Sequence, residues 1–545
     1  MTQVELLIAL LAVVAGVALL ARRVGVPYPI FLVGAGLLIG FTPGVPVLEI
    51  EPELILLVFI PPLVHAAAWS ASPRRLKAQA RTVGLLAVPL VGLTMAGVAA
   101  VAHAVVPELG WPAAFVLGAA VSPTDTVAAT AIFRRLGVPE RVTTLVEGES
   151  LLNDGVGLVL YRIAVVAAAT GVFSPWGALR DLVLVGVGGA AVGLVMAVGA
   201  KWIRRRVEDA TVEITLTLLT PYLVYVVAEE LHLSGILAAV SSGFYLGWRS
   251  AEDFSASTRI QATSFWTVLT FVLESILFLL VGLEVPGVLE ALEGEALAGL
   301  VWAALAVSLA VVAIRLAFVM GTGALESAWE RRAGRPGPEW RERAVVGWSG
   351  MRGAISLAAA LAVPLQTSSG APFPGRDLLL FLVLAVIGVT LVVQGLTLPA
   401  LIRRLGVEET RSSARGKAMA RFRTVEAALD RIADLSFETD APSRALERAR
   451  EMYVVRAQQL AGQCRTGVPE GEESDVGAWT TLRRQLLDVE RAALLELRDE
   501  GRVRTVVIRE VERDLALEEE RLNRAEVPTD GPGPAPAPVA TGGDG

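Results

Sequence analysis

Thirteen long runs of apolar residues follow one another along the first 404 residues of the chain. A membrane-spanning helix needs about 20 mostly apolar residues, because the hydrocarbon core of a bilayer is roughly 30 Å thick. Backbone groups find no water in that core, so a chain of this kind crosses it as helices. With 54% hydrophobic residues in 545, a soluble domain of this size is excluded. We therefore predict an all-α polytopic membrane protein with spans near residues 4–21, 29–45, 53–69, 83–106, 112–133, 143–169, 181–200, 211–229, 233–247, 261–284, 298–320, 344–364 and 378–402.

Positive charges fall in alternate loops of this arrangement. Twenty Lys and Arg residues occupy every second loop, from Arg22 after the first span to the arginines of residues 331–343. The intervening loops contain two, Arg180 and Arg376. Short cytoplasmic loops retain Lys and Arg, so the N-terminus is expected outside and the C-terminus in the cytoplasm. We accordingly expect a multi-pass protein of the plasma (inner) membrane, surrounded by membrane lipids.

Two of the predicted spans contain helix-breaking residues near mid-membrane. Span five holds Pro123 in "AAVSPTDTVAAT", and span twelve holds Gly347, Gly350 and Gly353 in "GWSGMRGAISL". The two spans are seven apart, so they cross in opposite directions, and each is the middle member of a trio, spans four to six and eleven to thirteen. This is the arrangement of inverted-repeat transporters, whose broken helices meet near the midplane and contact an ion.

Charged residues within the spans can be compared by depth, at about 1.5 Å of rise per residue. Asp154 in span six, Asp125 in span five and Arg352 in span twelve fall near the midplane. Glu149 and Arg315 share a depth nearer the cytoplasm. Opposite charges at one depth predict an ion pair, for which a structural lock between two helices is favoured over a role in transport.

The carboxylate of Asp154, with the amide of Asn153 next to it, has no evident partner in the sequence. A carboxylate inside a membrane is costly and is a functional candidate by default. It can hold either a proton or a small desolvated cation, and competition between the two is sufficient for exchange. The sequence contains no G-x-x-x-x-G-K-[ST] phosphate-binding loop, so it indicates neither ATP-driven pumping nor a cofactor.

The segments "SPTDTVAATAIFRRLGVPERVTTLVEGESLLNDGVGLVLYR" and "GWSGMRGAISLAAALAVP" resemble the monovalent cation:proton antiporter-1 family, the NhaP-like bacterial relatives of eukaryotic sodium/proton exchangers. The resemblance extends over residues 5–404 and does not cover the tail. It implies a homodimer in which spans one to three and seven to ten form a dimerisation domain. Spans four to six and eleven to thirteen would form a core that moves as an elevator. The implied activity is exchange of Na⁺, with Li⁺ or K⁺ as alternatives, for H⁺ in pH and sodium homeostasis.

The same resemblance implies roles for individual residues. Asp154 would carry the cation and the proton beside Asn153, and an Asn-Asp pair implies electroneutral exchange of one cation for one proton. The Na⁺ site would comprise Asp154, Ser150 and Thr124, with Asp125 beside the ion in the broken helix. The family's structural salt bridge and its second arginine fall on Glu149, Arg315 and Arg352.

One departure from the family concerns the third span. In "PPLVHAAAW", His65 and Ala66 stand where some members have an acid, which leaves the choice among Na⁺, Li⁺ and K⁺ open. For His65 a packing role is favoured over a pH sensor. Glu274, near the middle of span ten, is likewise expected to be a hydrogen-bonded structural acid, with pH sensing or ion binding as the alternative.

Beyond residue 404 the chain changes to a charged cytoplasmic tail. Residues 405–527 are predicted to be helical and residues 528–545, rich in Pro, Ala and Gly, to be disordered. A helical hairpin packed on itself is favoured over a regulatory or dimer contact, and no nucleic-acid partner is indicated. The expected apolar stripe comprises Leu482, Leu486, Val489, Ala493 and Leu497. Two other functions stay open: an organic-anion transporter using Arg352, and a receptor that signals through the tail.

Overall fold

The computed structural model describes residues 3–24, 27–43, 52–171, 175–207, 209–253, 256–332, 339–367, 370–407, 412–438 and short parts of 446–519. The chain divides into two compact units, residues 1–409 and 410–545. Each unit is considered by itself.

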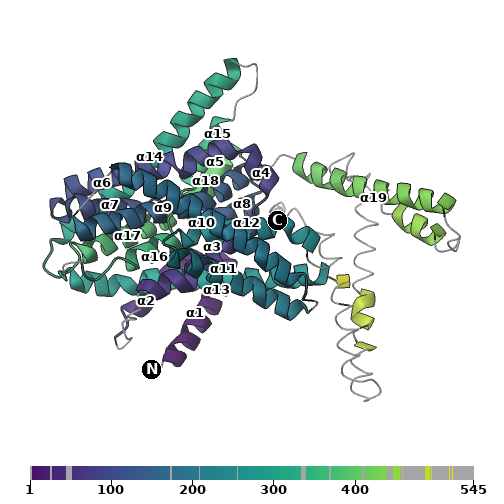
Figure 1. Ribbon diagram of the computed structural model, residues 1–545, viewed down its shortest axis with the longest axis horizontal. Helices are drawn as coiled ribbons and strands as arrows, with labels where there is room; N and C mark the ends of the chain where they lie inside the picture. Colours follow the sequence, from purple (N-terminus) through teal and green to yellow (C-terminus); the bar gives the residue numbers. More distant parts are fainter. Residues whose placement is uncertain are drawn as a thin grey trace, which may run out of the picture. The chain divides into compact units, whose positions relative to one another are not determined.

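The first unit is built from helices, and each of the thirteen predicted spans falls on one helix or on consecutive shorter ones (Figure 1). The helices that match predicted spans one to six are α1 (Gln3–Val24), α2 (Tyr28–Gly40), α3 (Pro52–Ser70), α5 (Ala80–Ala87) with α6 (Pro89–Val105), α7 (Gly110–Ala120) with α8 (Val127–Leu136), and α9 (Glu140–Thr170). Those that match spans seven to ten are α10 (Pro175–Arg204), α11 (Ala210–Glu230), α12 (Gly235–Asp253) and α13 (Ala256–Ala291). Spans eleven to thirteen correspond to α14 (Leu297–Arg332), α15 (Trp340–Trp348) with α16 (Ala354–Leu361), and α17 (Arg376–Val389), the π-helical turn η2 (Thr390–Gln394) and α18 (Gly395–Leu405). Two short helices, α4 (Pro73–Ala78) and η1 (Pro107–Leu109), lie in connections.

Length and hydropathy agree with a multi-pass membrane protein. Among the described residues, seven helices are long and apolar enough to cross a bilayer, and three shorter apolar helices accompany them. The C-terminal part of α14, which ends in Arg331 and Arg332, projects from the bundle (Figure 1). The number of crossings and the orientation of the chain stay predictions.

The helices of the first unit pack in two groups. In one group α6, α7 and α9 contact one another and pack against the second trio, through the pairs α6 with α14, α7 with α17, and α8 with α18. In the other group α2 lies along α13, and α12 packs against α3, α10 and α11. The two groups meet where α3 and α13 contact α16, and where α10 and α12 contact α9.

Glycines permit the closest helix contact in the second group. A side chain at Gly36 of α2 would collide with the backbone of Leu279 in α13, and one at Gly282 with the backbone of Val33 in α2. Small residues at such contacts let helix backbones approach closely, which is how membrane helices gain packing energy. The contact therefore holds α2 and α13 together as one rigid pair.

Two spans are broken where the sequence predicts it. The helical structure of the first stops after Ala120 and resumes at Val127, and that of the second stops after Trp348 and resumes at Ala354. The two breaks cross each other, because the N–H of Asp125 donates to the carbonyl of Met351 at 2.8 Å in an antiparallel bridge. The crossing thus leaves four helix ends close together inside the unit.

The second unit contains α19 (Ser412–Glu438) and short helical pieces. Within residues 485–490 the buried side chain is Leu487, whereas Leu486 and Val489 are 45% and 65% exposed. The predicted packing stripe is therefore wrong here, because a neighbouring helix position points about 100° away. Leu482, Leu497 and the predicted disordered segment 528–545 lie outside the described residues.

Candidate functional site

An acid lies at the two helix N-termini of the crossing. The Oδ1 atom of Asp125 accepts a hydrogen bond from the N–H of Val127 at 2.8 Å, in the first turn of α8. The same carboxylate is hydrogen-bonded by the N–H of Ala354, the first residue of α16. Helix N-termini carry unpaired N–H groups and partial positive charge, so they stabilise an anion. The charge of Asp125 is therefore compensated by two half-helices.

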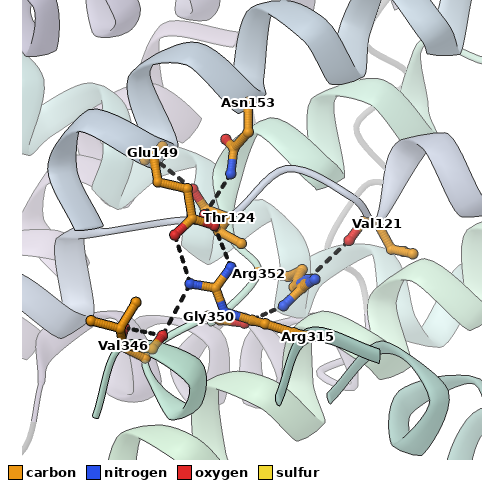
Figure 2. Close-up of polar contacts among 10 residues, drawn as sticks. Val121, Thr124, Glu149, Asn153, Arg315, Val346, Gly350 and Arg352 are labelled. Carbon is orange, nitrogen blue, oxygen red and sulfur yellow. Dashed lines mark hydrogen bonds and ion pairs between the residues drawn. The ribbon is translucent and has the colours of Figure 1, made fainter. Parts of the chain in front are cut away.

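An arginine lies at the opposite pair of helix ends (Figure 2). The Nε atom of Arg352 donates to the carbonyl of Val121 at 2.9 Å, at the C-terminus of α7, and its Nη1 atom donates to the carbonyl of Gly350 beyond α15. Its own N–H donates to Thr390 Oγ1 at 3.1 Å. Carbonyls at helix C-termini favour a cation. The guanidinium of Arg352 thus closes the crossing on the carbonyl side.

The predicted contact between Glu149 and Arg315 is present (Figure 2). Both side chains are 1% exposed and the pairing is bidentate, with Arg315 Nη2 donating to Glu149 Oε2 at 2.8 Å and Nη1 to Oε1. Arg315 Nη2 also donates to the carbonyl of Val346 at 3.1 Å in α15. The pair therefore joins α9, α14 and the second broken span.

Two polar side chains of α9 hold the first break in place. Ser150 Oγ donates to the carbonyl of Thr124 at 2.8 Å, and Asn153 Nδ2 donates to Thr124 Oγ1 at 2.8 Å. Figure 2 shows Asn153 pointing at Thr124. Both contacts fix the peptide that precedes Asp125, so the break is rigidly positioned against α9.

Asp154 lines a small cavity next to this crossing. Its Oδ1 atom has no hydrogen-bond partner among the described residues, although the side chain is buried. The cavity has a volume of about 80 Å³, enough for several water molecules or one partly hydrated cation. Its walls come from both groups of helices: Leu63, Val64 and Ala67 of α3, Glu274 of α13, Ser150 and Asp154 of α9, residues 123–127 of the first broken span, and residues 353–356 of the second.

The two remaining predicted residues have hydrogen-bonded surroundings. Glu274 faces the cavity and accepts a hydrogen bond from the Tyr28 hydroxyl at 2.9 Å. His65 is buried outside the cavity lining, with Nδ1 3.2 Å from the carbonyl of Ala239 and its ring stacked near Trp266. A carbonyl only accepts, so Nδ1 carries the proton of the neutral ring. These contacts fit the favoured packing role of His65.

Several contacts of the site have no signal in the sequence. The partners of Arg352 are main-chain carbonyls, which every residue possesses, and Tyr28 is far from Glu274 along the chain. Ser356 of α16, which also lines the cavity, is one hydroxyl in an apolar helix. Depth along a helix predicts pairs of opposite charge, but it does not identify a carbonyl or hydroxyl partner.

Comparison with known proteins agrees with this architecture. The chain matches the family model described as sodium/hydrogen exchanger, transmembrane, over residues 7–404. An uncharacterized Na⁺/H⁺ exchanger of Mycobacterium tuberculosis (strain ATCC 25618 / H37Rv) is 34% identical over 526 residues, 95% of each chain. The sodium, potassium, lithium and rubidium/H⁺ antiporter of Bacillus pumilus (strain SAFR-032) is 32% identical over 403 residues, 72% of this chain and 60% of that protein.

The fold itself has a known counterpart. The structure of the sodium proton antiporter MjNhaP1 from Methanocaldococcus jannaschii superimposes with a TM-score of 0.61 at 21% identity, covering 74% of this chain and 99% of the other. A family match over most of the chain and relatives above 30% identity lead to one conclusion. This multi-pass membrane protein belongs to the sodium/hydrogen exchanger family of monovalent cation:proton antiporters.

Proposed function

We propose that this protein exchanges Na⁺ for H⁺ across the plasma membrane, one cation for one proton, by competition of the two for the carboxylate of Asp154. Its role would be pH and sodium homeostasis. One observation carries the proposal. The Oδ1 atom of Asp154 faces a cavity without a hydrogen-bond partner among the described residues, whereas the other charged residues of the crossing are compensated by helix ends or by each other.

The cavity offers oxygen ligands suited to a small hard cation. The Asp154 carboxylate provides the negative charge, while the side chain of Ser150 and the backbone of Thr124 lie on the same wall. Asn153 acts through Thr124, because its amide donates to that hydroxyl. With one carboxylate to neutralise, a bound Na⁺ and a bound proton exclude each other, which gives electroneutral exchange.

Alternating access follows from where the cavity lies. One wall comes from α3 and α13 and the other from α9 and the two broken spans. We assign the first group of helices (α5–α9 and α14–α18) to a moving core and the second (α1–α3 and α10–α13) to a dimerisation domain of a homodimer. Sliding of the core past α3 and α13 would carry Asp154 from one side of the membrane to the other, as an elevator does.

The test is cation-driven proton movement in proteoliposomes. A pH-sensitive dye inside reports alkalinisation or acidification on addition of Na⁺, Li⁺ or K⁺ to wild type, Asp154→Asn and Asp377→Asn. Asp377 is a half-exposed acid of α17 outside the cavity lining, so its variant serves as the control. We expect signals for wild type and the control, and at least a hundredfold loss for Asp154→Asn. Full activity of Asp154→Asn, or no response of wild type to any of the three cations, would refute the proposal.

K⁺/H⁺ exchange is the second candidate. It is favoured by the similarity to the Bacillus pumilus protein, whose name includes sodium, potassium, lithium and rubidium. The apolar α3 wall, with Val64 and Ala67, adds no charge that would favour the smaller ion. A larger maximal signal with K⁺ than with Na⁺ in the same vesicles would select this alternative.

A further inference from the structure

One polar group of the cavity has no assigned function. Ser356 lies in the first turn of α16, in the second broken span, and lines the same cavity as Asp154. Its side chain is 1% exposed, and its Oγ atom has no hydrogen-bond partner among the described residues. A buried hydroxyl without a partner is unfavourable by about 1–3 kcal/mol, so such groups are usually satisfied by water or a ligand.

The position of Ser356 explains why its own helix does not satisfy it. Buried serines in helices commonly donate to a carbonyl three or four residues earlier. Ser122 and Ser349 do so here, each at 2.9 Å from the carbonyl three residues before. The residues three and four before Ser356 are Gly353 and Arg352, which lie in the break and not in a helix. The hydroxyl therefore remains available to the cavity.

We propose that the Ser356 hydroxyl is an oxygen ligand of the transported cation, contributed by the second broken span. This inference rests on the proposed exchange at Asp154. The Asp154 carboxylate and Ser150 approach the cavity from α9, and Ser356 completes the shell from α16. A bound cation then links α9 to both broken spans, whereas a proton on Asp154 needs no third group. Ser356 discriminates between the two competing ions in this way.

The expected effect is selective for the cation. Ser356→Ala removes one neutral oxygen and leaves Asp154 in place, so the apparent KM for Na⁺ should rise roughly five- to tenfold, equivalent to about one hydrogen bond. Because the proton competes for the same carboxylate, the pH that gives half-maximal exchange at a fixed low Na⁺ concentration should move upward. Ser356→Cys, which fills nearly the same space with a poor ligand for hard cations, should act likewise. Ser356→Thr retains the hydroxyl and should stay near the wild-type KM.

A matched control is available in α14. Ser308 is 2% exposed and also lacks a hydrogen-bond partner among the described residues, but it does not line the cavity. Ser308→Ala therefore tests the loss of a buried hydroxyl as such. All variants are assayed as full-length protein in proteoliposomes with Na⁺, Li⁺ and K⁺. Binding is followed separately as the rise in melting temperature that Na⁺ produces in detergent.

The outcomes separate the inference from the proposed function. A raised KM and a smaller Na⁺-induced rise in melting temperature for Ser356→Ala and Ser356→Cys, with Ser308→Ala like wild type, support the role of Ser356. Unchanged KM values for all three cations in an active Ser356→Ala protein, or equal changes in Ser308→Ala, overturn it while leaving Asp154 as carrier. Loss of exchange in the wild type itself would instead remove the proposed function.

Discussion

At the scale of single residues, four charged groups meet in the crossing and three kinds of compensation are used. Asp125 is held by two helix N-termini, Arg352 by carbonyls at two C-terminal ends, and Glu149 by Arg315. Each arrangement offsets the cost of a charge away from water. Asp154 alone of the four acids and bases near the midplane and the lock keeps an oxygen without a hydrogen bond among the described residues. A transported ion can compensate it only temporarily, which is what turnover requires.

The Glu149–Arg315 pair should behave as a structural lock. Removing one partner leaves an unpaired buried charge, which typically lowers the free energy of unfolding by about 3–5 kcal/mol. We expect Glu149→Gln and Arg315→Ala each to lower the melting temperature in detergent, and the double variant to lose less than the sum of the two. Strictly additive losses would show that the two side chains do not act as partners. Ser308→Ala provides a baseline for a change at a buried polar position of the same helix as Arg315.

The candidate site was predictable from the sequence where charges lie on continuous helices. Glu149 and Arg315 were matched because rise per residue gives depth, and the structure has both on unbroken helices. Depth also brought Asp125 and Arg352 to one level, but not their partners, because helix ends in a break have no sequence signature. Ser356 was missed for the same reason, since its availability depends on where α16 begins.

At the scale of elements, the two breaks depend on close approach rather than on proline alone. A side chain at Gly353 would collide with the carboxylate of Asp125, and one at Gly350 with the guanidinium of Arg315. Gly353 has φ −154°, an extended conformation open to any residue, so contact is its sole restriction. The glycines of the second break therefore make room for charges of the first break and of α14.

Gly353→Ala should disrupt the crossing. The added methyl group forces Asp125 away from the N-termini of α8 and α16, at a cost typical of overpacking, about 1–3 kcal/mol. We expect at least a tenfold lower exchange rate and a lower melting temperature. The control is Gly321→Ala in α14, where an added Cβ has no atom within 4 Å and alanine favours the helix. Wild-type exchange by Gly353→Ala, or an equal loss in the control, would contradict the role given to the crossing.

Helices were predicted better than their packed faces. Apolar run length located every span of the first unit, since a bilayer imposes one length and one composition. The tail lacks that constraint, and there the stripe of Leu486 and Val489 was placed on the wrong face, with Leu487 buried instead. A short amphipathic pattern fits two neighbouring faces of a helix almost equally, and contacts with the rest of the unit decide between them.

At the scale of the whole molecule, the membrane unit contains the complete candidate site. All residues that line the cavity lie between Leu63 and Ser356, and the family match ends at residue 404. The Mycobacterium tuberculosis relative aligns with 95% of the chain, so it also shares sequence in the tail, whereas the Bacillus pumilus relative aligns with 72%. Relatives of this family thus share the membrane unit and differ in how much of the tail they match.

Removal of the second unit should therefore leave exchange intact. The compact division falls after Glu409, so a chain of residues 1–409 keeps every group of the cavity and of the crossing. We expect its KM for Na⁺ in proteoliposomes to stay within about twofold of the full chain, since no ligand in the proposed site is lost. Asp154→Asn in the shortened chain should abolish the signal, which shows that the same carboxylate carries it. Size-exclusion chromatography and the melting temperature establish that the shortened chain is folded. A folded, monodisperse 1–409 protein without exchange would mean that the tail takes part in the transport cycle itself.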